Sequence, residues 1–537
     1  MNRRDFLQLS AVATAQLTVG CAATKPSPRA PGPVATTKPF EYEEATLAQL
    51  QAAMNSGKET AASLTKKFLD RIVEIDRRGP KLNSFIELNT DAVAIARALD
   101  AERKAKGPRG PLHGIPVVLK DNIDTHDRMT TTAGSLALSG SIPLQDSFVA
   151  QKLREAGVVI LGKTNLSEWA NFRGDRSTSG WSGRGGLTNN PYALDRNPSG
   201  SSSGSAAAVS ANLSPLAIGT ETDGSIVSPS SLCGIVGIKP TIGLVSRAGI
   251  IPIAHSQDTA GPIARTVTDA AILLGALTGY DSRDVATENN RGKAERDYTP
   301  FLDANGLRGA RLGVARRFFR AGGIAEKILE GMLAEMKQLG AIIVDPADDP
   351  ALAKFGDAER TVLLYEFKAD LNAYLASLGP SAPVRTLADI IEFNERNKNK
   401  ELPYFGQETM IKAQEKGPLT EKEYLDALEK CRRLSREEGI DAVMNKHQLD
   451  AIVAPSGGPA GKTDLVYGDR GAGGSSSPAA VAGYPNITVP AGEVFGLPIG
   501  ISFFGRAFSE PTLIKLAFAF EQATKARKAP RFLATVG

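Results

Sequence analysis

Serine residues stand in three arrangements that could supply a catalytic nucleophile. The first, from Gly200 to Gly204, reads G-x-S-x-G and centres on Ser202. A nucleophile elbow of this kind needs a strand before the turn, a helix after it, and an acid and a histidine further along the chain. A helix can follow this motif, but YALDRNPS before it is typical of a turn. The later histidines are His255 and His447, the second in a charged helical stretch, so the pattern disfavours this arrangement.

The second arrangement is an S-x-x-K motif from Ser63 to Lys66, as in penicillin-binding proteins and serine β-lactamases. Its usual companions, S-D-N and K-T-G, are absent from the sequence. The same spacing belongs to an amphipathic helix whose apolar face carries Leu64 and Phe68. We therefore expect Ser63 and Lys66 to be ordinary helix residues.

The third arrangement combines three segments spread over about a hundred residues. They are PVVLKDN with Lys120, PSGSSSGSAAAV with Ser201, and GTETDGSIVSPS with Ser225. A serine hydroxyl becomes a nucleophile when a base takes its proton, and an amine can be that base if it is neutral. The order and spacing of these two serines and one lysine along the chain define the third arrangement.

The order and spacing of the three segments resemble the amidase signature family. The block from Gly114 to Thr241 carries the most specific part of this likeness, which extends to GYPNITVP and GLPIGISFFG near the C-terminus. TNLSEWANFR, GTETDGSIVSPS and SPAAVAGYPNITVP are most similar to the peptide amidase branch. The resemblance implies an α/β fold whose large, twisted, mixed and mostly parallel central sheet is covered by helices on both faces.

The resemblance also implies a Ser-Ser-Lys catalytic triad. Ser225 would be the nucleophile that attacks the amide carbonyl, and Lys120 would be the general base. Ser201, joined to Gly200 by a cis peptide bond, would pass protons between them. A free lysine has a pKa of about 10.4, and burial can lower that pKa far enough for the amine to be neutral at pH 7. The apolar run GIPVVLK predicts that Lys120 is buried.

Substrate-binding groups are implied by the same resemblance. The developing oxyanion would be held by four consecutive backbone N–H groups, those of Thr222, Asp223, Gly224 and Ser225. Asn171 lies where related enzymes line the acyl side of the site, and it could hydrogen-bond a peptide backbone. Neither a metal nor another cofactor is implied.

Two nearby features are expected to be structural. The family loop commonly reads Gly-Gly-Ser-Ser-Gly-Gly, whereas Ser199 and Ser203 occupy two of the glycine positions here. Because both residues are small and Ser201 is retained, we expect the turn to form. Asp121, next to Lys120, is expected to accept structural hydrogen bonds.

The predicted reaction is hydrolysis of a carboxylic amide, through an acyl-enzyme on Ser225. The substrate would be a small-molecule or peptide amide, and a peptide C-terminal amide fits the branch resemblance. Aryl, aliphatic or fatty amides are the alternatives. An amidotransferase role is disfavoured by the predicted export signal and the near-neutral charge, and a binding protein on an inactive scaffold is disfavoured by the presence of Lys120, Ser201 and Ser225 together.

Alternating helical and apolar segments would position these residues. Amphipathic patterns predict helices over 44–57, 60–79, 91–107 and 146–157. Short, continuous apolar runs predict strands buried on both faces. These runs lie at 114–122, 157–165, 214–221, 311–316, 340–345, 449–455, 486–492 and 499–505.

The predicted domain organisation is an export signal at 1–24, a Pro/Thr-rich spacer at 25–39, and an amidase domain at 40–537 with a helical elaboration at about 281–445. RRDFLQ near the N-terminus resembles a twin-arginine signal. The protein is therefore expected in the periplasm, and Cys21 is either a lipid attachment site or part of a segment removed by ordinary cleavage.

Composition narrows the possible partners. The chain of 537 residues carries 63 basic and 59 acidic side chains, and its formal charge of +4 predicts no nucleic-acid partner. No apolar run after the signal reaches the ~18 residues of a membrane-spanning helix. The three cysteines suggest neither a disulfide framework nor a metal site, and Cys233 is expected to be buried. Oligomeric state has no signal in the sequence.

Overall fold

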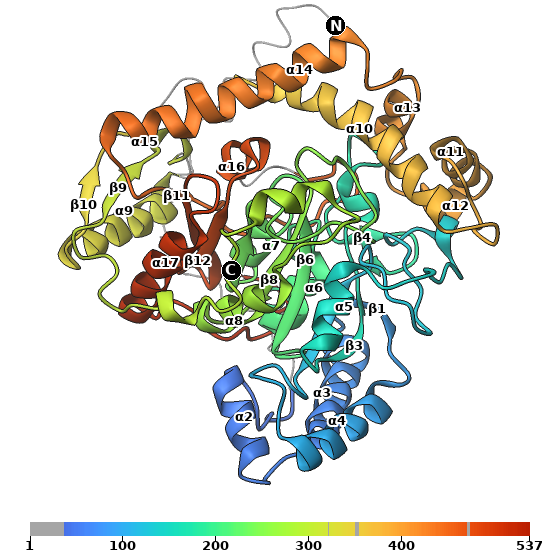
Figure 1. Cartoon of the computed structure of the whole chain (residues 1–537), viewed down its shortest axis with the longest axis horizontal. Helices are drawn as coiled ribbons and strands as arrows, with labels where there is room; N and C mark the ends of the chain where they lie inside the picture. Colours follow the sequence, from blue (N-terminus) through green and yellow to red (C-terminus); the bar gives the residue numbers. More distant parts are fainter. Residues whose placement is uncertain (1–36, 320–321, 349–353, 470–472, 537) are drawn as a thin grey trace, which may run out of the picture.

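One eleven-stranded sheet organises the protein in the computed structural model of Figure 1, which describes residues 37–319, 322–348, 354–469 and 473–536. In spatial order the strands are β1 (Phe85–Leu88), β3 (Val159–Thr164), β2 (Pro116–Lys120), β6 (Leu216–Glu221), β8 (Thr259–Ala264), β7 (Val236–Lys239), β12 (Asn486–Val494), β13 (Leu497–Phe504), β11 (Ala451–Pro455), β9 (Arg311–Val314) and β10 (Ile342–Val344). A separate pair is formed by β4 (Trp181–Ser182) and β5 (Gly186–Leu187).

The sheet is mixed, as the sequence predicts. β2 pairs in parallel with β3 and β6, and β9 pairs in parallel with β10 and β11. The other six pairings between described strands of this sheet are antiparallel. Parallel pairs are therefore a minority, where a majority was expected. An apolar run shows that both faces of a strand are buried, but it does not carry the direction of the neighbouring strand.

All eight predicted strand segments contain a strand, whereas three strands of the eleven-stranded sheet and the separate β4–β5 pair were not predicted. The unpredicted strands of the large sheet are β1, β7 and β8, with the sequences FIEL, VGIK and TAGPIA. Each is short or rich in small residues, so none forms a long apolar run. β8 is nevertheless fully buried between β6 and β7, because its neighbours and not its own side chains define the pairing.

The four predicted helices form close to their expected bounds. They are α2 (Leu47–Asn55), α3 (Ala61–Ile72) with its π-helical continuation to Arg78, α4 (Ala92–Lys106) and α5 (Phe148–Glu155). Capping boxes begin two of them, because Thr46 accepts a hydrogen bond from the N–H of Gln49, and Thr60 accepts one from the N–H of Ser63. α4 ends at Gly107, where φ is +79°.

The remaining helices pack against the sheet or form a layer over one end of the molecule. Helices that contact the sheet include α6 (Ser203–Ser210), α7 (Val227–Leu232), α8 (Val267–Leu277), α9 (Gly323–Gln338) and α17 (Glu510–Thr524). The short α16 (Ser476–Ala482) lies against the π-helical turn Arg433–Ile440 and α14. Helices on both faces of a mixed sheet give the α/β fold that the resemblance implied.

We call residues 356–447 the helical cover. It contains α10 (Gly356–Ser377), α11 (Leu387–Arg396), α12 (Lys398–Glu401), α13 (Glu408–Gln414), α14 (Lys422–Arg432) and α15 (Asp441–His447). α14 and α15 run along the top of Figure 1, and α10 packs beside α14. Leu364 and Phe367 on α10 also belong to one buried hydrophobic cluster with Trp169 and Ile253, which lie on loops beside the strand ends. The predicted helical region at about 281–445 thus contains all but the last two residues of this cover, together with β9, α9 and β10.

Several sequence-based expectations concern the chain ends and the cysteines. The predicted export signal at 1–24, including Cys21, and the predicted spacer up to residue 36 lie outside the described residues. In the part of the chain that the structure describes, no helix is both long enough and apolar enough to cross a membrane. Cys233 and Cys431 are both buried free thiols, and burial raises the pKa of the Cys233 thiol well above its usual range.

Candidate active site

The carboxyl ends of three parallel strands meet at one edge of the sheet and carry most of the predicted site. Lys120 ends β2, Thr164 ends β3, and Glu221 ends β6. Loops that follow such strand ends form the crevices in which α/β enzymes bind their ligands. Ser225 follows β6 after one turn, so the fold alone brings Lys120 and the Ser225 segment to the same edge.

Lys120 is completely buried and donates hydrogen bonds to two side-chain hydroxyls. Its Nζ lies 2.7 Å from Ser201 Oγ and 2.8 Å from Thr220 Oγ1, and it also donates to the Thr220 carbonyl oxygen at 3.2 Å. Burial lowers the pKa of Lys120 to about 7, although the more distant carboxyls of Asp258 and Glu221 act in the opposite direction. The amine is therefore neutral in a large fraction of molecules at neutral pH, when it can accept a proton.

Ser201 lies in a tightly constrained loop. The peptide bond between Gly200 and Ser201 is cis, as the resemblance implied. The Ser201 carbonyl oxygen accepts a hydrogen bond from the backbone N–H of Ser167 at 3.1 Å. The hydroxyl groups of the two serines that replace family glycines both have hydrogen-bond partners. Ser203 Oγ donates to the Ser199 carbonyl oxygen at 2.6 Å, and Ser199 Oγ lies 2.8 Å from Ser228 Oγ.

A side chain at position 200 has no room. A Cβ on Gly200 would lie 2.2 Å from Ser167 Oγ, well inside van der Waals contact. We expect Gly200→Ala to displace the loop that carries Ser201 and to lower kcat by about tenfold or more, because small misplacements of reacting groups are costly. Steady-state kinetics and a thermal melt test this expectation.

Gly331→Ala provides the matched control, since nothing lies within 4 Å of a Cβ at that position of α9. Alanine favours a helix over glycine by roughly 1 kcal/mol, so this variant should keep its activity and at least its wild-type thermal midpoint. Unchanged kcat in Gly200→Ala would show that the loop tolerates the extra carbon.

Ser225 is nearly buried and is anchored to the Ser201 loop. Its carbonyl oxygen accepts a hydrogen bond from the backbone N–H of Ser202 at 3.2 Å. The turn around it is held by Glu221, whose Oε2 accepts the N–H groups of Ile226 at 2.7 Å and Val227 at 3.0 Å. Lys120, Ser201 and Ser225 are thus brought together from three separate segments of the chain.

The segment from Thr222 to Ser225 leaves backbone donors available. In the described part of the chain, the N–H groups of Asp223, Gly224 and Ser225 form no hydrogen bond. Gly224 has a φ of +80°, and a Cβ there would lie 2.9 Å from Ser476 Oγ. The segment is fixed by its side chains instead, since Thr222 Oγ1 donates to Asp258 at 2.6 Å. Unpaired amides on a rigid segment suit the binding of an anionic oxygen.

Two cavities flank the Thr222–Ser225 segment. The first has a volume of about 200 Å³, and its lining includes Asn122, Ala170, Thr220, Thr222, Ile253 and Asp258. The second has a volume of about 360 Å³, and its lining includes Ser199, Gly200, Asp223, Gly224, Asp469 and Ser476. The first cavity has more apolar walls, and the second is polar, so the two sides of the segment offer different surroundings to a bound molecule.

Asn171 ends a segment with an unusual backbone. Trp169, Ala170 and Asn171 have φ values of +50°, +54° and +71°, a left-handed conformation that non-glycine residues seldom adopt. Ala170 lines the first cavity. Asn171 Nδ2 donates to Ser179 Oγ at 2.9 Å, and Asn171 Oδ1 is buried with no partner among the described residues. A substrate contact by Asn171 stays a prediction.

The competing serine motifs have structural roles. Ser202 Oγ donates to the Thr220 carbonyl oxygen at 3.1 Å and accepts the Thr220 N–H at 3.2 Å. The Ser63 hydroxyl accepts a hydrogen bond from the backbone N–H of Thr60 at the start of α3. Lys66 is exposed and forms a salt bridge with Asp70. Among the described residues, neither serine has a buried lysine amine in contact with its hydroxyl, as Ser201 has.

Asp121 is confirmed as a structural acceptor. Its Oδ2 accepts hydrogen bonds from Thr132 Oγ1 and from the backbone N–H of Gly134. Its carboxyl is completely buried, and burial raises its pKa. Asp121 lines neither cavity beside the Thr222–Ser225 segment, so its place in the fold is to hold the 132–134 turn against β2.

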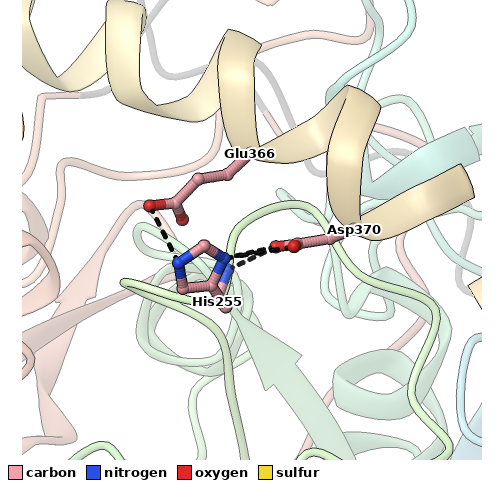
Figure 2. A group of neighbouring side chains, drawn as sticks. All are labelled: His255, Glu366 and Asp370. Atoms are coloured by element: carbon pink, nitrogen blue, oxygen red, sulfur yellow. Dashed lines mark hydrogen bonds and ion pairs between the residues drawn. The ribbon is translucent and has the colours of Figure 1, made fainter. Parts of the chain in front are cut away.

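A histidine between two acids also borders the first cavity (Figure 2). His255 Nδ1 lies 2.8 Å from Asp370 Oδ2, and His255 Nε2 lies 3.4 Å from Glu366 Oε1. The carboxyls face opposite edges of the ring, and a metal ion binds only one edge, so this trio does not fit a single-ion site. Glu366 further accepts hydrogen bonds from Tyr424 and from the N–H of Ser256. The trio fastens α10 to the 253–258 loop.

Sequence reasoning missed several residues that shape the site. Thr220 contacts Lys120, and Glu221 holds the turn after Ser225. Both lie inside GTETDGS, so their closeness to Ser225 was a usable signal. Glu359, Glu366 and Asp370 on α10 had no signal, because no motif links the helical cover to the strand ends.

Comparisons with known proteins agree with this geometry. The family model Amidase matches residues 63–514. The crystal structure of native peptide amidase from Stenotrophomonas maltophilia superimposes with a TM-score of 0.88 at 51% identity, over 92% of this chain and 100% of that one. A probable amidase of Arabidopsis thaliana is 44% identical over 504 residues, 92% of this chain and 93% of that relative. A putative amidase of Schizosaccharomyces pombe is 37% identical over 534 residues, 93% of this chain and 88% of that relative.

Proposed function

This chain belongs to the amidase family, and we propose that it hydrolyses the C-terminal amide of peptides to the free acid and ammonia, with Ser225 as nucleophile. The observation that carries the proposal is the fully buried Lys120 amine, 2.7 Å from the Ser201 hydroxyl, next to the turn of Ser225. A buried lysine with no ion-pair partner among the described residues is costly in its charged form, which supports a role as a base.

The first step forms an acyl-enzyme. Ser225 Oγ attacks the carbonyl carbon of the substrate amide and forms a C–O bond. The Ser225 proton passes to Ser201 Oγ, while the Ser201 proton passes to the neutral Lys120 Nζ. The carbonyl π electrons move to the oxygen, which becomes the oxyanion of a tetrahedral intermediate.

Backbone donors stabilise that oxyanion in the proposed mechanism. The N–H groups of Thr222, Asp223, Gly224 and Ser225 point to the oxygen as its negative charge develops. Removing one such donor from a hydrolase typically costs about 100- to 1,000-fold in kcat. The absence of competing hydrogen bonds to three of these amides in the described chain supports this role.

The relay then runs in reverse. The C–N bond breaks, the leaving nitrogen takes the proton that returns from Lys120 through Ser201, and ammonia departs. Water attacks the carbonyl carbon of the acyl-enzyme while its proton passes through Ser201 to Lys120. The C–O bond to Ser225 then breaks, Ser225 Oγ keeps the electron pair and takes the proton back through Ser201, and the free acid departs. Protons and electrons balance in both steps without any further reactant.

A panel of amides tests the substrate class. We expect ammonia release from a peptide amide with a kcat/KM at least about tenfold above that for an aryl amide or a fatty amide, since the chain is 51% identical to a peptide amidase. The same peptide with a free carboxylate is the matched control, because it has no C-terminal amide nitrogen to release.

Faster turnover of the aryl or fatty amide would assign this chain to that substrate class instead. No ammonia from any amide, with Ser225 unreactive toward a fluorophosphonate, would indicate an inactive scaffold that serves as a binding protein.

A further inference from the structure

The side chain of Asp223 projects from the segment that supplies the proposed oxyanion donors. Its two carboxylate oxygens accept hydrogen bonds from the first turn of α16, with Ser476 Oγ 2.5 Å from Oδ1 and Ser477 Oγ 2.6 Å from Oδ2. The segment before Ser225 is therefore tied to an element more than 250 residues away in the sequence. Its position depends on that carboxylate.

A second carboxyl, that of Glu359 on α10, lies near enough to Asp223 for the two carboxyl groups to interact. Two carboxylates cannot share a hydrogen bond when both are ionised, because neither carries a proton to donate. Burial and the neighbouring Asp223 charge hold the pKa of Glu359 well above its usual range. A Glu359 carboxyl that keeps its proton at neutral pH has a donor to offer Asp223.

Gln257, on the 253–258 loop, forms hydrogen bonds with both Glu359 and Thr222. Its Nε2 donates to Glu359 Oε1 at 3.0 Å and to the Thr222 carbonyl oxygen at 3.2 Å. Glu359 is thus linked to Asp223 directly and to Thr222 through Gln257. Both residues contribute a backbone N–H to the proposed oxyanion hole.

The rest of α10 holds Glu359 in place. Glu359, Glu366 and Asp370 are spaced by seven and four residues, which places them on one face of the helix. Glu366 accepts the N–H of Ser256 at 2.9 Å. Asp370 accepts the N–H of His255 at 2.9 Å, and Figure 2 shows both acids beside His255. The helix therefore docks on the 253–258 loop at several points, of which Glu359 is the one that contacts the oxyanion segment.

We propose that Glu359 in its protonated form is a positioning residue that holds the backbone donors of Thr222 and Asp223 in the oxyanion hole. The proposal rests on the proposed function, since it assumes that this segment stabilises the oxyanion. In this proposal the helical cover contributes to catalysis, because Glu359 on α10 acts through Asp223 and does not contact the substrate.

Loss of the Glu359 proton would set two negative charges against each other. The ionisable groups that interact with Glu359 are Asp223 and the thiol of Cys431 on α14. Asp258 and His255 lie on the adjacent loop, where Asp258 accepts a hydrogen bond from Thr222 and His255 pairs with Glu366. None of these supplies a cation in contact with Glu359. Ionised Glu359 would repel Asp223 and displace the donors, so kcat should fall as the pH rises above neutral.

The test is the pH dependence of kcat and KM for the full-length protein, with peptide-amide hydrolysis as the assay. Glu359→Gln keeps a donor to Asp223 and cannot ionise. It should retain neutral-pH activity within about threefold and lose the alkaline decline. Glu359→Ala removes the donor and should lower kcat by about tenfold or more at every pH, with KM changed by less than about twofold.

Glu521→Gln is the matched control. Glu521, like Glu359, is a partly buried acid whose pKa is raised by desolvation, in its case to about 7, but it lies on α17 and accepts the N–H of Val267. This variant should keep the wild-type alkaline decline. Asp223→Asn also removes the repulsion and should lose the alkaline decline, but at a lower kcat, because an amide nitrogen cannot accept the hydrogen bond from Ser477.

An alkaline decline that persists unchanged in both Glu359→Gln and Asp223→Asn would overturn the proposal. Fluorophosphonate labelling of Ser225 is followed in every sample. If Ser225 is labelled but the pH profile is the same in the wild type and in Glu359→Gln, only the positioning role of Glu359 is contradicted. If Ser225 is not labelled in the wild type, the proposed function itself is contradicted.

Discussion

Replacing Ser225 with alanine is expected to abolish ammonia release and labelling by an activated fluorophosphonate. Without the Ser225 hydroxyl no acyl-enzyme forms, and the loss in kcat should be about 10⁴-fold or more, since removal of a catalytic serine leaves only the rate that binding and the oxyanion donors supply. Kinetics at saturating peptide amide, together with mass spectrometry of the labelled protein, measure both effects. The fold should survive, because the Ser225 contact to Ser202 uses its backbone.

Ser63→Ala and Ser202→Ala test whether the serine of a competing motif, and not Ser225, is the nucleophile. Ser63 lies at the start of α3, so its removal should leave labelling and turnover intact. Ser202→Ala loses hydrogen bonds to the Thr220 backbone and should lower stability, yet Ser225 should still be labelled. Full turnover in Ser225→Ala, or labelling that disappears only in Ser202→Ala, would contradict the assignment.

Removing the Lys120 amine is the second change with a large expected effect. Lys120→Met keeps a side chain of similar length but no base, and kcat should fall by about 10²- to 10⁴-fold. Lys120→Arg should be equally inactive, because a guanidinium stays protonated and accepts no proton. Lys66→Met removes an exposed lysine of the competing S-x-x-K motif and should have wild-type kinetics.

The pH profile of the wild type gives an independent measurement of the same group. Burial lowers the pKa of Lys120 to about 7, and only the neutral amine accepts a proton. Activity should therefore fall as the pH falls through about 7. This decline lies on the acidic side of neutrality, whereas the decline expected from ionisation of Glu359 lies on the alkaline side. A wild-type profile that stays flat from neutral to mildly acidic pH would argue against Lys120 as the base, as would substantial activity in Lys120→Arg.

Much of the site could be predicted from the sequence because its chemistry is carried by local motifs. Lys120, Ser201 and Ser225 each lie in a short segment whose residues set the local backbone, and the apolar run before Lys120 predicted the burial that lowers its pKa. The family, the α/β class and all eight predicted strand segments were confirmed for the same reason.

Long-range pairing could not be predicted. Gln257 and Glu359 form a hydrogen bond although they are 102 residues apart. Neither the helix pattern nor the charge spacing around Glu359 indicates that this acid of the helical cover lies beside the Thr222–Ser225 segment. The three unpredicted strands of the large sheet and the excess of antiparallel pairs have the same origin. A strand's own side chains report its burial, but its neighbours decide its direction and register.

The sequence by itself therefore determined the candidate reacting groups and most of the elements that carry them, because hydroxyls, an amine and an apolar run are properties of contiguous residues. Only the tertiary structure decided what surrounds those groups. It placed Thr220 against Lys120 and left the amides of Asp223, Gly224 and Ser225 unpaired in the described chain. It also set the Glu359 carboxyl against Asp223. These features come from chain segments that meet only when the sheet and its helical cover are assembled, so no local pattern encodes them.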